Sequence, residues 1–407
     1  MTGAEAAPAL SLPRVESAVK SASNTVGRYG GVVLQAAAAS NQSLLFAAAA
    51  GGLENGAEKI SLRDSFEVAS VTKIVTATAV LQLADEGLLH LDQDLQEVAE
   101  GRVSVMIQEK VPKWPLNRLR GVTITQLLQH TSGLPNYWKG PFVKTFEANP
   151  DKEWSTWELL GYAADMKESC PLSNRGLPAS FSYADTNYLL LGLVLETLTE
   201  SKLPAIFRAR VFDPAGMSRI GTYCSFLEHS PQDAPPLAKR YVGHTQITGK
   251  MQHSADSFAA GGIVSTTSDL QKLMAALARG DLFPIGGKAT LERMMSWIPA
   301  KRGAGFSYGL GLMRVDLDAQ KGIFKRWFSQ GKPRGFIWGH EGFGGAFSWC
   351  WVPGDSRPDV IISGSTNNEA RSYGVLIEQL VDDLEPHLVT LNFEGRLEIP
   401  AASNQNL

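Results

Sequence analysis

A serine and a lysine near the start of the chain have the types and spacing that acyl chemistry needs. Ser70 and Lys73 stand three positions apart in the stretch FEVASVTK, residues 66–73. Residues three apart share one face of a helix, so the pattern places a hydroxyl beside an amine. A neutral amine is a general base for such a hydroxyl, which then acts as a nucleophile. The alternative is an N-capping serine followed by an ordinary lysine.

The helix that must position this pair is expected to run from Ser70 to about Glu86, with Gly87 as its stop. Residues 74–84 carry no charge, which predicts a buried helix. Lys73 is then expected to be a lone cation in apolar surroundings, which favour the neutral amine. Ser70 at the start of the helix would lie near unpaired N–H groups that favour an alkoxide.

Cleavage of an acyl bond also needs a second proton relay and donors for the oxyanion. Tyr183, in the stretch FSYADTNY at 181–188, is one candidate, because a nearby lysine cation favours the phenolate and would lower the pKa of the phenol. The alternative is a half-buried loop aromatic. His340, in the glycine-rich stretch WGHEGFGG at 338–345, is the other candidate. Its alternative is a surface histidine at a strand edge.

Composition narrows the class of protein. The chain has 407 residues, 44% of them hydrophobic, and a formal net charge of -3, so nothing favours nucleic acid or an acidic membrane surface as a partner. Three widely spaced cysteines argue against a disulfide framework or a zinc site, and all three are expected to be buried. The sequence shows no secretory signal, and its richest apolar stretch, 32–50, is interrupted by polar residues 40–43. We therefore expect a cytoplasmic protein with no membrane partner.

Strand patterns gather at both ends of the chain and helical patterns in its middle. Strands are expected at 30–34, 44–46, 306–315, 346–352 and 360–362, and helices at 13–28, 188–199, 269–277 and 370–384. Thr123 and Gln126 form a capping-box pattern that opens a short helix ending near His130. This order predicts one sheet assembled from the two termini, with a helical region inserted between them.

Three motifs together resemble one family, the penicillin-recognising serine hydrolases of the class C β-lactamase type. That group also includes D,D-carboxypeptidases, D-aminopeptidases, β-lactamase-like esterases and some acyltransferases. Its motifs S-x-x-K, Y-x-N and K/H-x-G correspond here to SVTK at 70–73, YAD at 183–185 and HEG at 340–342. Flanking stretches also resemble the family: QHTSGLP at 129–135, NYLLLG at 187–192, GGIVST at 261–266 and YGLG at 308–311.

The resemblance implies an α/β (α+β) fold of the β-lactamase/transpeptidase type: an antiparallel sheet from both termini, flanked by helices. One catalytic unit would span 13–390, with the α/β part at about 13–90 and 300–390, the helical part at about 91–299, and a loose tail at 391–407. Ser70 would be the acyl nucleophile, Lys73 a base or proton shuttle, Tyr183 the partner base and later acid, and His340 the third-motif residue. The backbone N–H groups of Ser70 and Phe343 would form the oxyanion hole. No metal or cofactor is implied.

Two residues depart from the family pattern. Asp185 stands where asparagine is usual, and an ionised carboxylate cannot donate a hydrogen bond to an acyl-amide carbonyl. It would also favour protonated Lys73 and shift the base role toward Tyr183. Glu341, beside Gly342, stands where threonine or serine is usual and is expected to repel a substrate carboxylate. Both changes weaken the case for penicillins and D-Ala-D-Ala peptides and leave simple esters unaffected.

Aromatic residues near the motifs are further candidates for substrate contacts, although a residue of this kind more often belongs to the core than to a pocket: Tyr137, Trp138, Trp338 and Phe343. The leading hypothesis is a serine hydrolase that cleaves small carboxylic esters through an acyl-serine intermediate. The alternatives are a D-amino-acid peptidase, amidase or weak β-lactamase, an acyltransferase that uses the same acyl-enzyme, and a non-catalytic scaffold. The oligomeric state is not predicted.

Overall fold

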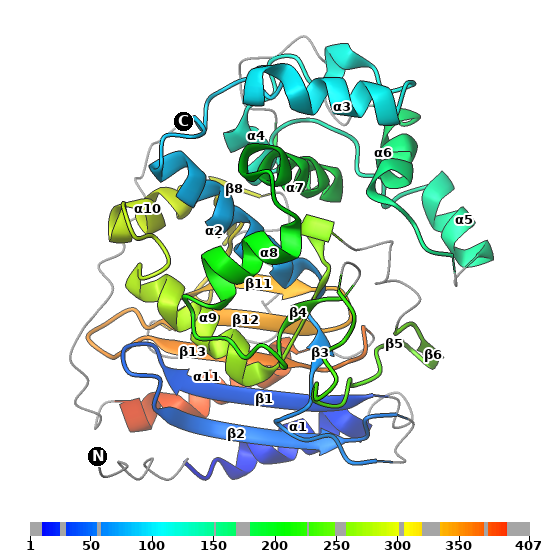
Figure 1. Ribbon diagram of the computed structural model, residues 1–407. Helices are drawn as coiled ribbons and strands as arrows, with labels where there is room; N and C mark the ends of the chain where they lie inside the picture. Colours follow the sequence, from blue (N-terminus) through cyan, green and yellow to red (C-terminus); the bar gives the residue numbers. More distant parts are fainter. Residues whose placement is uncertain are drawn as a thin grey trace.

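We describe a computed structural model of the chain (Figure 1) over residues 10–24, 30–54, 58–149, 152–167, 180–225, 228–248, 258–300, 305–319, 334–369 and 373–388. Several sequence predictions fall outside these ranges: part of the first helix, the start of the last helix, Cys170, and the proposed tail at 391–407. Cys224 and Cys350 are buried and free, as expected.

An eight-stranded sheet joins the two ends of the chain. Its order is β2-β1-β13-β12-β11-β10-β9-β8, and every neighbouring pair is antiparallel. The predicted sheet from both termini is therefore confirmed. The strands are β1 (Gly31–Ala38), β2 (Leu44–Gly51), β8 (Ile298–Pro299), β9 (Phe306–Tyr308), β10 (Met313–Asp316), β11 (Phe336–Gly342), β12 (Ala346–Val352) and β13 (Val360–Ser365).

Helices cover both faces of this sheet (Figure 1). Helices α1 (Pro13–Asn24) and α11 (Gly374–Leu388) pack together on one face, over a core that includes Val15, Leu380 and Trp349. On the other face, α2 (Thr72–Asp85) contacts β11, and α9 (Thr267–Arg279) contacts β12 and β13. The predicted helices near both termini are thus present, and they close the sheet from one side.

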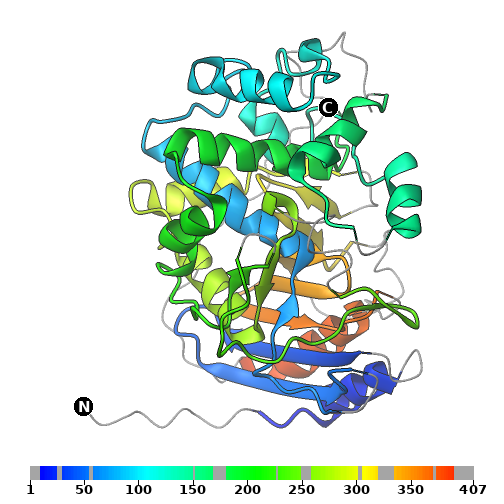
Figure 2. The ribbon, with the colours of Figure 1, turned by 45° about the vertical axis from the view of Figure 1, so that its right-hand side comes forward.

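The middle of the chain is mainly helical, as the sequence predicts. Helices α3 to α6 lie at the end of the molecule farthest from β1 and β2 in both views (Figures 1 and 2). None of the helices in the described ranges is long and apolar enough to cross a membrane. The remaining helices are α3 (Arg102–Lys110), α4 (Ile124–Leu128), α5 (Pro141–Ala148), α6 (Thr156–Ala164), α7 (Asp185–Thr199), α8 (Leu203–Phe207) and α10 (Gly287–Met294).

Two short sheets complete the fold. One has the order β3-β7-β4, and the other pairs β5 with β6. The first leads directly into the Ser70 turn, because its strand β3 ends three residues before Ser70. The strands are β3 (Phe66–Glu67), β4 (Tyr223–Cys224), β5 (Tyr241–Val242), β6 (Thr245–Gln246) and β7 (Ile263–Ser265).

Local signals predicted some boundaries well and others poorly. The capping box of Thr123 and Gln126 is present and opens α4. The run 306–315, predicted as one strand, is instead two strands, β9 and β10. They are separated by a turn in which the N–H of Gly309 donates to the carbonyl of Leu312 at 2.8 Å. Gly311 has φ +81°, a conformation that favours glycine and reverses the chain here.

Candidate active site

Ser70 lies in a tight turn that joins β3 to α2. A 3-10 turn spans Ala69–Val71, and Ala69 adopts φ +45°, a strained value for a residue with a side chain. Residues 72–83 of α2 are all buried, which confirms the predicted buried helix. The turn and the buried helix together hold the Ser70 hydroxyl at a fixed place above the sheet.

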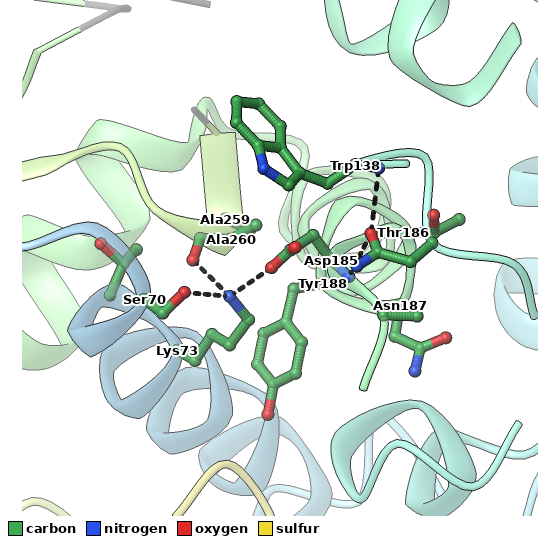
Figure 3. A network of polar contacts seen from close by, with 12 residues as sticks. Ser70, Lys73, Trp138, Asp185, Thr186, Asn187, Tyr188, Ala259 and Ala260 are labelled. Carbon is green, nitrogen blue, oxygen red and sulfur yellow. Dashed lines mark hydrogen bonds and ion pairs between the residues drawn. The ribbon is translucent and has the colours of Figure 1, made fainter. Parts of the chain in front are cut away.

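Lys73 is not the lone cation that the sequence predicted. Its Nζ is fully buried and lies 2.9 Å from Ser70 Oγ, 2.7 Å from Asp185 Oδ1 and 2.8 Å from the carbonyl oxygen of Ala260 (Figure 3). Each of these oxygens can accept a hydrogen bond from an ammonium group. The carboxylate comes from 112 residues away, so the neutral amine expected from local sequence is replaced by an ion pair.

Asp185 begins α7 and is held there by its own backbone. Its N–H donates to Asn136 Oδ1 at 3.2 Å, and the same oxygen accepts a hydrogen bond from the N–H of Trp138 at 3.2 Å. The side chain exposes 11% of its surface. The start of α7 therefore fixes the carboxylate against Lys73, and the expected effect of this aspartate on the lysine charge has a structural basis.

Tyr183 lies beside the Ser70–Lys73 pair, but its titration differs from the prediction. Its ring centre is 5.1 Å from Lys73 Nζ, and its hydroxyl hydrogen-bonds with Lys73 and Ser70. Burial raises the pKa of Tyr183 to about 12 from an ordinary 10.0, and the Lys73 cation only partly offsets this. The lowered pKa predicted for this phenol is therefore wrong, because loss of water outweighs the cation. Tyr183 carries its proton at neutral pH.

His130 braces the Tyr183 loop. The ring of His130 stacks on that of Tyr183 with 4.2 Å between centroids, and its Nδ1 accepts from the N–H of Ala184 at 3.2 Å. The carbonyl oxygen of His130 accepts from the N–H of Ser182 at 2.8 Å. The position of the Tyr183 hydroxyl therefore depends on a histidine 53 positions earlier in the sequence.

The raised pKa of Tyr183 predicts a specific loss of stability in alkali. The pKa of Tyr183 is higher in the folded protein than in the unfolded chain. The neutral phenol therefore makes its full contribution to the free energy of unfolding below pH 10, and this contribution is lost as pH rises from 10 to 12. We expect wild-type protein to lose on the order of 1–2 kcal/mol more than Tyr183→Phe across this window. Chemical denaturation of both proteins at several pH values measures it, and parallel pH profiles would contradict it. Burial also raises the pKa values of Tyr188 and Tyr308, but both residues are common to the two proteins.

His340 is fully buried on β11 and belongs to a second layer behind Tyr183. Its Nε2 lies 3.0 Å from the hydroxyl of Tyr308, its Nδ1 lies 2.5 Å from the carbonyl oxygen of Glu341, and its ring centre is 6.3 Å from that of Tyr183. A direct role for His340 on substrate stays a prediction. Tyr308 is the residue that sequence reasoning missed here, although its YGLG stretch was noted as family-like.

The backbone at Ser70 and Phe343 agrees with the predicted oxyanion hole. Among the described residues, neither the N–H of Ser70 nor that of Phe343 donates to another backbone carbonyl. The turn that carries Phe343 approaches the Ser70 turn closely, since a Cβ on Gly342 would lie 2.1 Å from the carbonyl oxygen of Val68. Glycine is therefore required at 342. The role of the two N–H groups stays a prediction.

A buried ion pair supports the turn that carries Phe343. Arg240 Nη1 donates to the carbonyl oxygen of Phe343 at 2.9 Å, and Arg240 Nε lies 3.0 Å from Glu67 Oε2, with both side chains 2% exposed. Gly344 leaves room for the guanidinium, because a Cβ there would lie 2.0 Å from Arg240 Cδ. The pair links β3, just before Ser70, to the turn that carries Phe343. It is a positioning element that the sequence did not reveal.

We expect Arg240→Met to lower kcat about tenfold with little change in KM, because a displaced oxyanion donor weakens binding of the transition state rather than of the substrate. Steady-state kinetics on an activated ester measures the split. Arg357→Met is the matched control, since Arg357 is another buried guanidinium, paired with Asp355 and Glu385. It is expected to lose stability without this kcat effect. A folded Arg240→Met enzyme with wild-type kcat would contradict the positioning role.

Comparison with known proteins settles the family. Residues 18–380 match the family model described as Beta-lactamase. This chain belongs to the beta-lactamase family. The fold and the order of the three motifs agree with that membership, and the predicted resemblance is confirmed.

Relatives of this beta-lactamase-family chain act in different ways. It is 27% identical over 327 residues to a penicillin-binding protein of Bacillus subtilis, covering 76% of this chain and 62% of that protein. It is 26% identical over 238 residues to the lovastatin esterase of Penicillium rubens, covering 54% of this chain and 56% of that protein. The chain thus spans less than two thirds of the length of each. These likenesses leave both the activity and the substrate of this chain open.

Solved structures support the same fold. A D-stereospecific amidohydrolase from a Streptomyces species matches with a TM-score of 0.65 and 25% identity, over 91% of this chain and 98% of that one. A D-amino acid amidase from Ochrobactrum anthropi matches with a TM-score of 0.65 and 21% identity, over 92% and 99%. The predicted β-lactamase/transpeptidase-like fold is therefore confirmed.

The four aromatic candidates fall into two groups according to their burial. Tyr137 and Trp338 are wholly buried in the core, so they line no open site, and for these two the core alternative is the correct one. Trp138 is partly exposed, and its backbone N–H shares Asn136 Oδ1 with the N–H of Asp185 (Figure 3). Phe343 is also partly exposed, in the oxyanion turn. These last two remain candidates for contact with a substrate.

Glu341 does not share a face with His340. In the register of β11 with β12, His340 lies opposite Ser348 and Glu341 lies opposite Phe347. Phe347 stacks on Tyr373 with 4.9 Å between ring centroids, at the face that α11 covers. Because successive side chains of a strand point to opposite faces, the Glu341 carboxylate leaves the His340 face. Repulsion of a substrate carboxylate by Glu341 stays a prediction, without support from its direction.

A cavity of about 670 Å³ adjoins the strand that leads to Ser70. Its lining includes Glu67 of β3 and Val264 of β7, which face each other in the sheet register. Tyr223 of β4, which is also paired with Val264, lines the cavity together with Ser225 and Glu228. No sequence motif pointed to this cavity, because its walls come from four separate segments.

Proposed function

We propose that this protein hydrolyses carboxylic esters through an acyl-Ser70 intermediate. The observation that carries the proposal is the contact of Lys73 with both Ser70 and Asp185, which couples the nucleophile to a buried carboxylate. The likeness to a lovastatin esterase supports ester chemistry in this family. The fold and the family alone would fit amide substrates equally well.

Acylation begins with attack of Ser70 Oγ on the ester carbonyl carbon. The serine proton moves to Lys73 Nζ while Lys73 passes a proton to Asp185 Oδ1, so no charged group is left without a partner. After this transfer Asp185 is a neutral acid, and Lys73 remains an ammonium group that balances the negative charge of the oxyanion. The N–H groups of Ser70 and Phe343 stabilise the tetrahedral oxyanion.

Collapse of this intermediate expels the alcohol. The Tyr183 hydroxyl, protonated because its pKa is raised to about 12, gives its proton to the departing alkoxide. Lys73 then reprotonates Tyr183 and recovers a proton from Asp185, which restores the starting ion pair. Water attacks the acyl-enzyme by the same relay, and Ser70 regains its proton as the carboxylic acid leaves.

The carboxylate at 185 favours esters over acylated amino compounds. An ionised carboxylate offers acceptors only, so a substrate carbonyl facing it would lose its hydrogen bond with water without a replacement. A simple ester has no such group to place there. Penicillins and acylated peptides therefore lose an interaction that esters do not need.

The test compares matched substrates. We expect hydrolysis of p-nitrophenyl butyrate to exceed that of p-nitrobutyranilide and of a chromogenic cephalosporin, with acylated Ser70 detected by mass spectrometry during ester turnover. Preferred release of amines from D-amino-acid amides would favour the amidase alternative, which the Streptomyces amidohydrolase likeness supports. Accumulation of a new ester when an alcohol is added would favour the acyltransferase alternative.

A further inference from the structure

Asp185 presents one carboxylate oxygen that the protein does not use. Oδ1 accepts from Lys73 Nζ at 2.7 Å, whereas Oδ2 has no hydrogen-bond partner among the described residues. The residue as a whole is 8% exposed, and Oδ2 does not belong to the fully buried side-chain atoms that lack a partner, so a ligand in the site can reach it. A carboxylate oxygen that no protein group donates to can accept a hydrogen bond from such a ligand.

The distance from the nucleophile limits which part of a substrate can supply that donor. Lys73 Nζ touches both Ser70 Oγ and Asp185 Oδ1, so the carboxylate lies no farther from the nucleophile than these two contacts combined. The acyl carbon bonds directly to Ser70 Oγ in the intermediate. A substituent on the first or second carbon beyond the acyl carbon is therefore within reach of Asp185.

Charge decides the kind of donor. Asp185 is already neutralised by the Lys73 ammonium group, so a second cation would be attracted by the carboxylate and repelled by Lys73 at similar range. A neutral hydroxyl avoids that repulsion and still forms a charge-assisted hydrogen bond.

We propose that Asp185 selects hydroxyacyl esters, by accepting a hydrogen bond from a hydroxyl on the second or third carbon of the acyl group. This inference rests on the proposed ester hydrolysis and names its substrate class. The selectivity is for a donor: an ether at the same place presents only lone pairs to the carboxylate, and a plain alkyl chain leaves Oδ2 without a partner.

The experiment uses three p-nitrophenyl esters: 3-hydroxybutyrate, as separate enantiomers, 3-methoxybutyrate and butyrate. We expect wild-type kcat/KM for one hydroxy enantiomer to exceed that for the methoxy ester about tenfold or more, as a hydrogen bond to a charged group predicts. In Asp185→Asn the ratio is expected to fall toward one, because a carboxamide can donate to either oxygen. Asp281→Asn, in the Arg279–Asp281 ion pair, is the control and should keep the wild-type ratio.

The decisive quantity is the ratio of kcat/KM for the preferred hydroxy ester to kcat/KM for the methoxy ester. A wild-type ratio near one overturns the inference, even if Asp185→Asn fails to fold. A high ratio that Asp185→Asn leaves unchanged overturns it as well. In both cases the esters are turned over and the proposed function stands. If wild-type enzyme turns over none of the three esters and Ser70 is not acylated, the proposed function fails, and the inference fails with it.

Discussion

Ser70→Ala is expected to lose ester hydrolysis by about four orders of magnitude or more. Removing the nucleophile of a serine hydrolase leaves only the contributions of binding and the oxyanion hole. Lys73 and Tyr183 both hydrogen-bond to the Ser70 hydroxyl, and neither can replace it as a nucleophile in the turn before α2. The comparison is the initial rate on p-nitrophenyl butyrate for wild type and variant at equal concentrations of folded protein, with fluorophosphonate labelling expected for wild type alone.

The control for this loss is Ser363→Ala. Ser363 is a buried serine on β13 whose hydroxyl pairs with that of Ser348 at 2.8 Å, so the variant loses a hydroxyl of the same kind. It is expected to retain ester hydrolysis and fluorophosphonate labelling. Wild-type rates in a folded Ser70→Ala protein would refute the acyl-serine mechanism.

The second large effect is expected at Lys73, on both stability and activity. Lys73→Met removes the cation and leaves the Asp185 carboxylate buried without its partner. Breaking a buried pair in this way costs about 3–5 kcal/mol, because the remaining charge is poorly solvated. Ester hydrolysis is expected to fall as well, since the proton path from Ser70 to Asp185 passes through Lys73.

A double variant separates the two effects. In Lys73→Met/Asp185→Asn neither partner is charged, so much of the lost stability is expected to return while ester hydrolysis does not. Thermal or urea denaturation measures the first quantity and p-nitrophenyl butyrate turnover the second. If Lys73→Met alone is as stable as wild type, the pair is not the buried ion pair described here.

Much of the site could be predicted from short stretches of sequence. The Ser70–Lys73 spacing, the uncharged run after it and the Thr123 capping box depend on neighbours within a few residues, and the structure agrees with each. The sheet from both termini followed from strand patterns at the two ends of the chain. Local periodicity and capping act over one or two turns, which is why they are visible without tertiary information.

The failures share a physical cause, which is contact over long sequence distance. The apolar run beside Lys73 predicted a neutral amine, whereas Asp185, 112 residues later, favours the cation; only the comparison with the family motif, and no local pattern, pointed to that effect. The same holds for Tyr183, whose pKa depends on how much water the folded site excludes. The Glu67–Arg240 pair behind the oxyanion turn joins two unrelated segments. No window of sequence contains these interactions.

The pairing of β1 with β13 affects how the chain folds during its synthesis. Strand β1 cannot complete its central hydrogen bonds until β13, more than three hundred residues later, has left the ribosome. Closing so long a loop is entropically costly, and folds dominated by such contacts form slowly. The Ser70 turn and the Phe343 turn come from opposite halves of the chain, so the two turns can meet only after the C-terminal half has been made. During synthesis, the Ser70 segment therefore exists for most of the time without the turn that would complete its site.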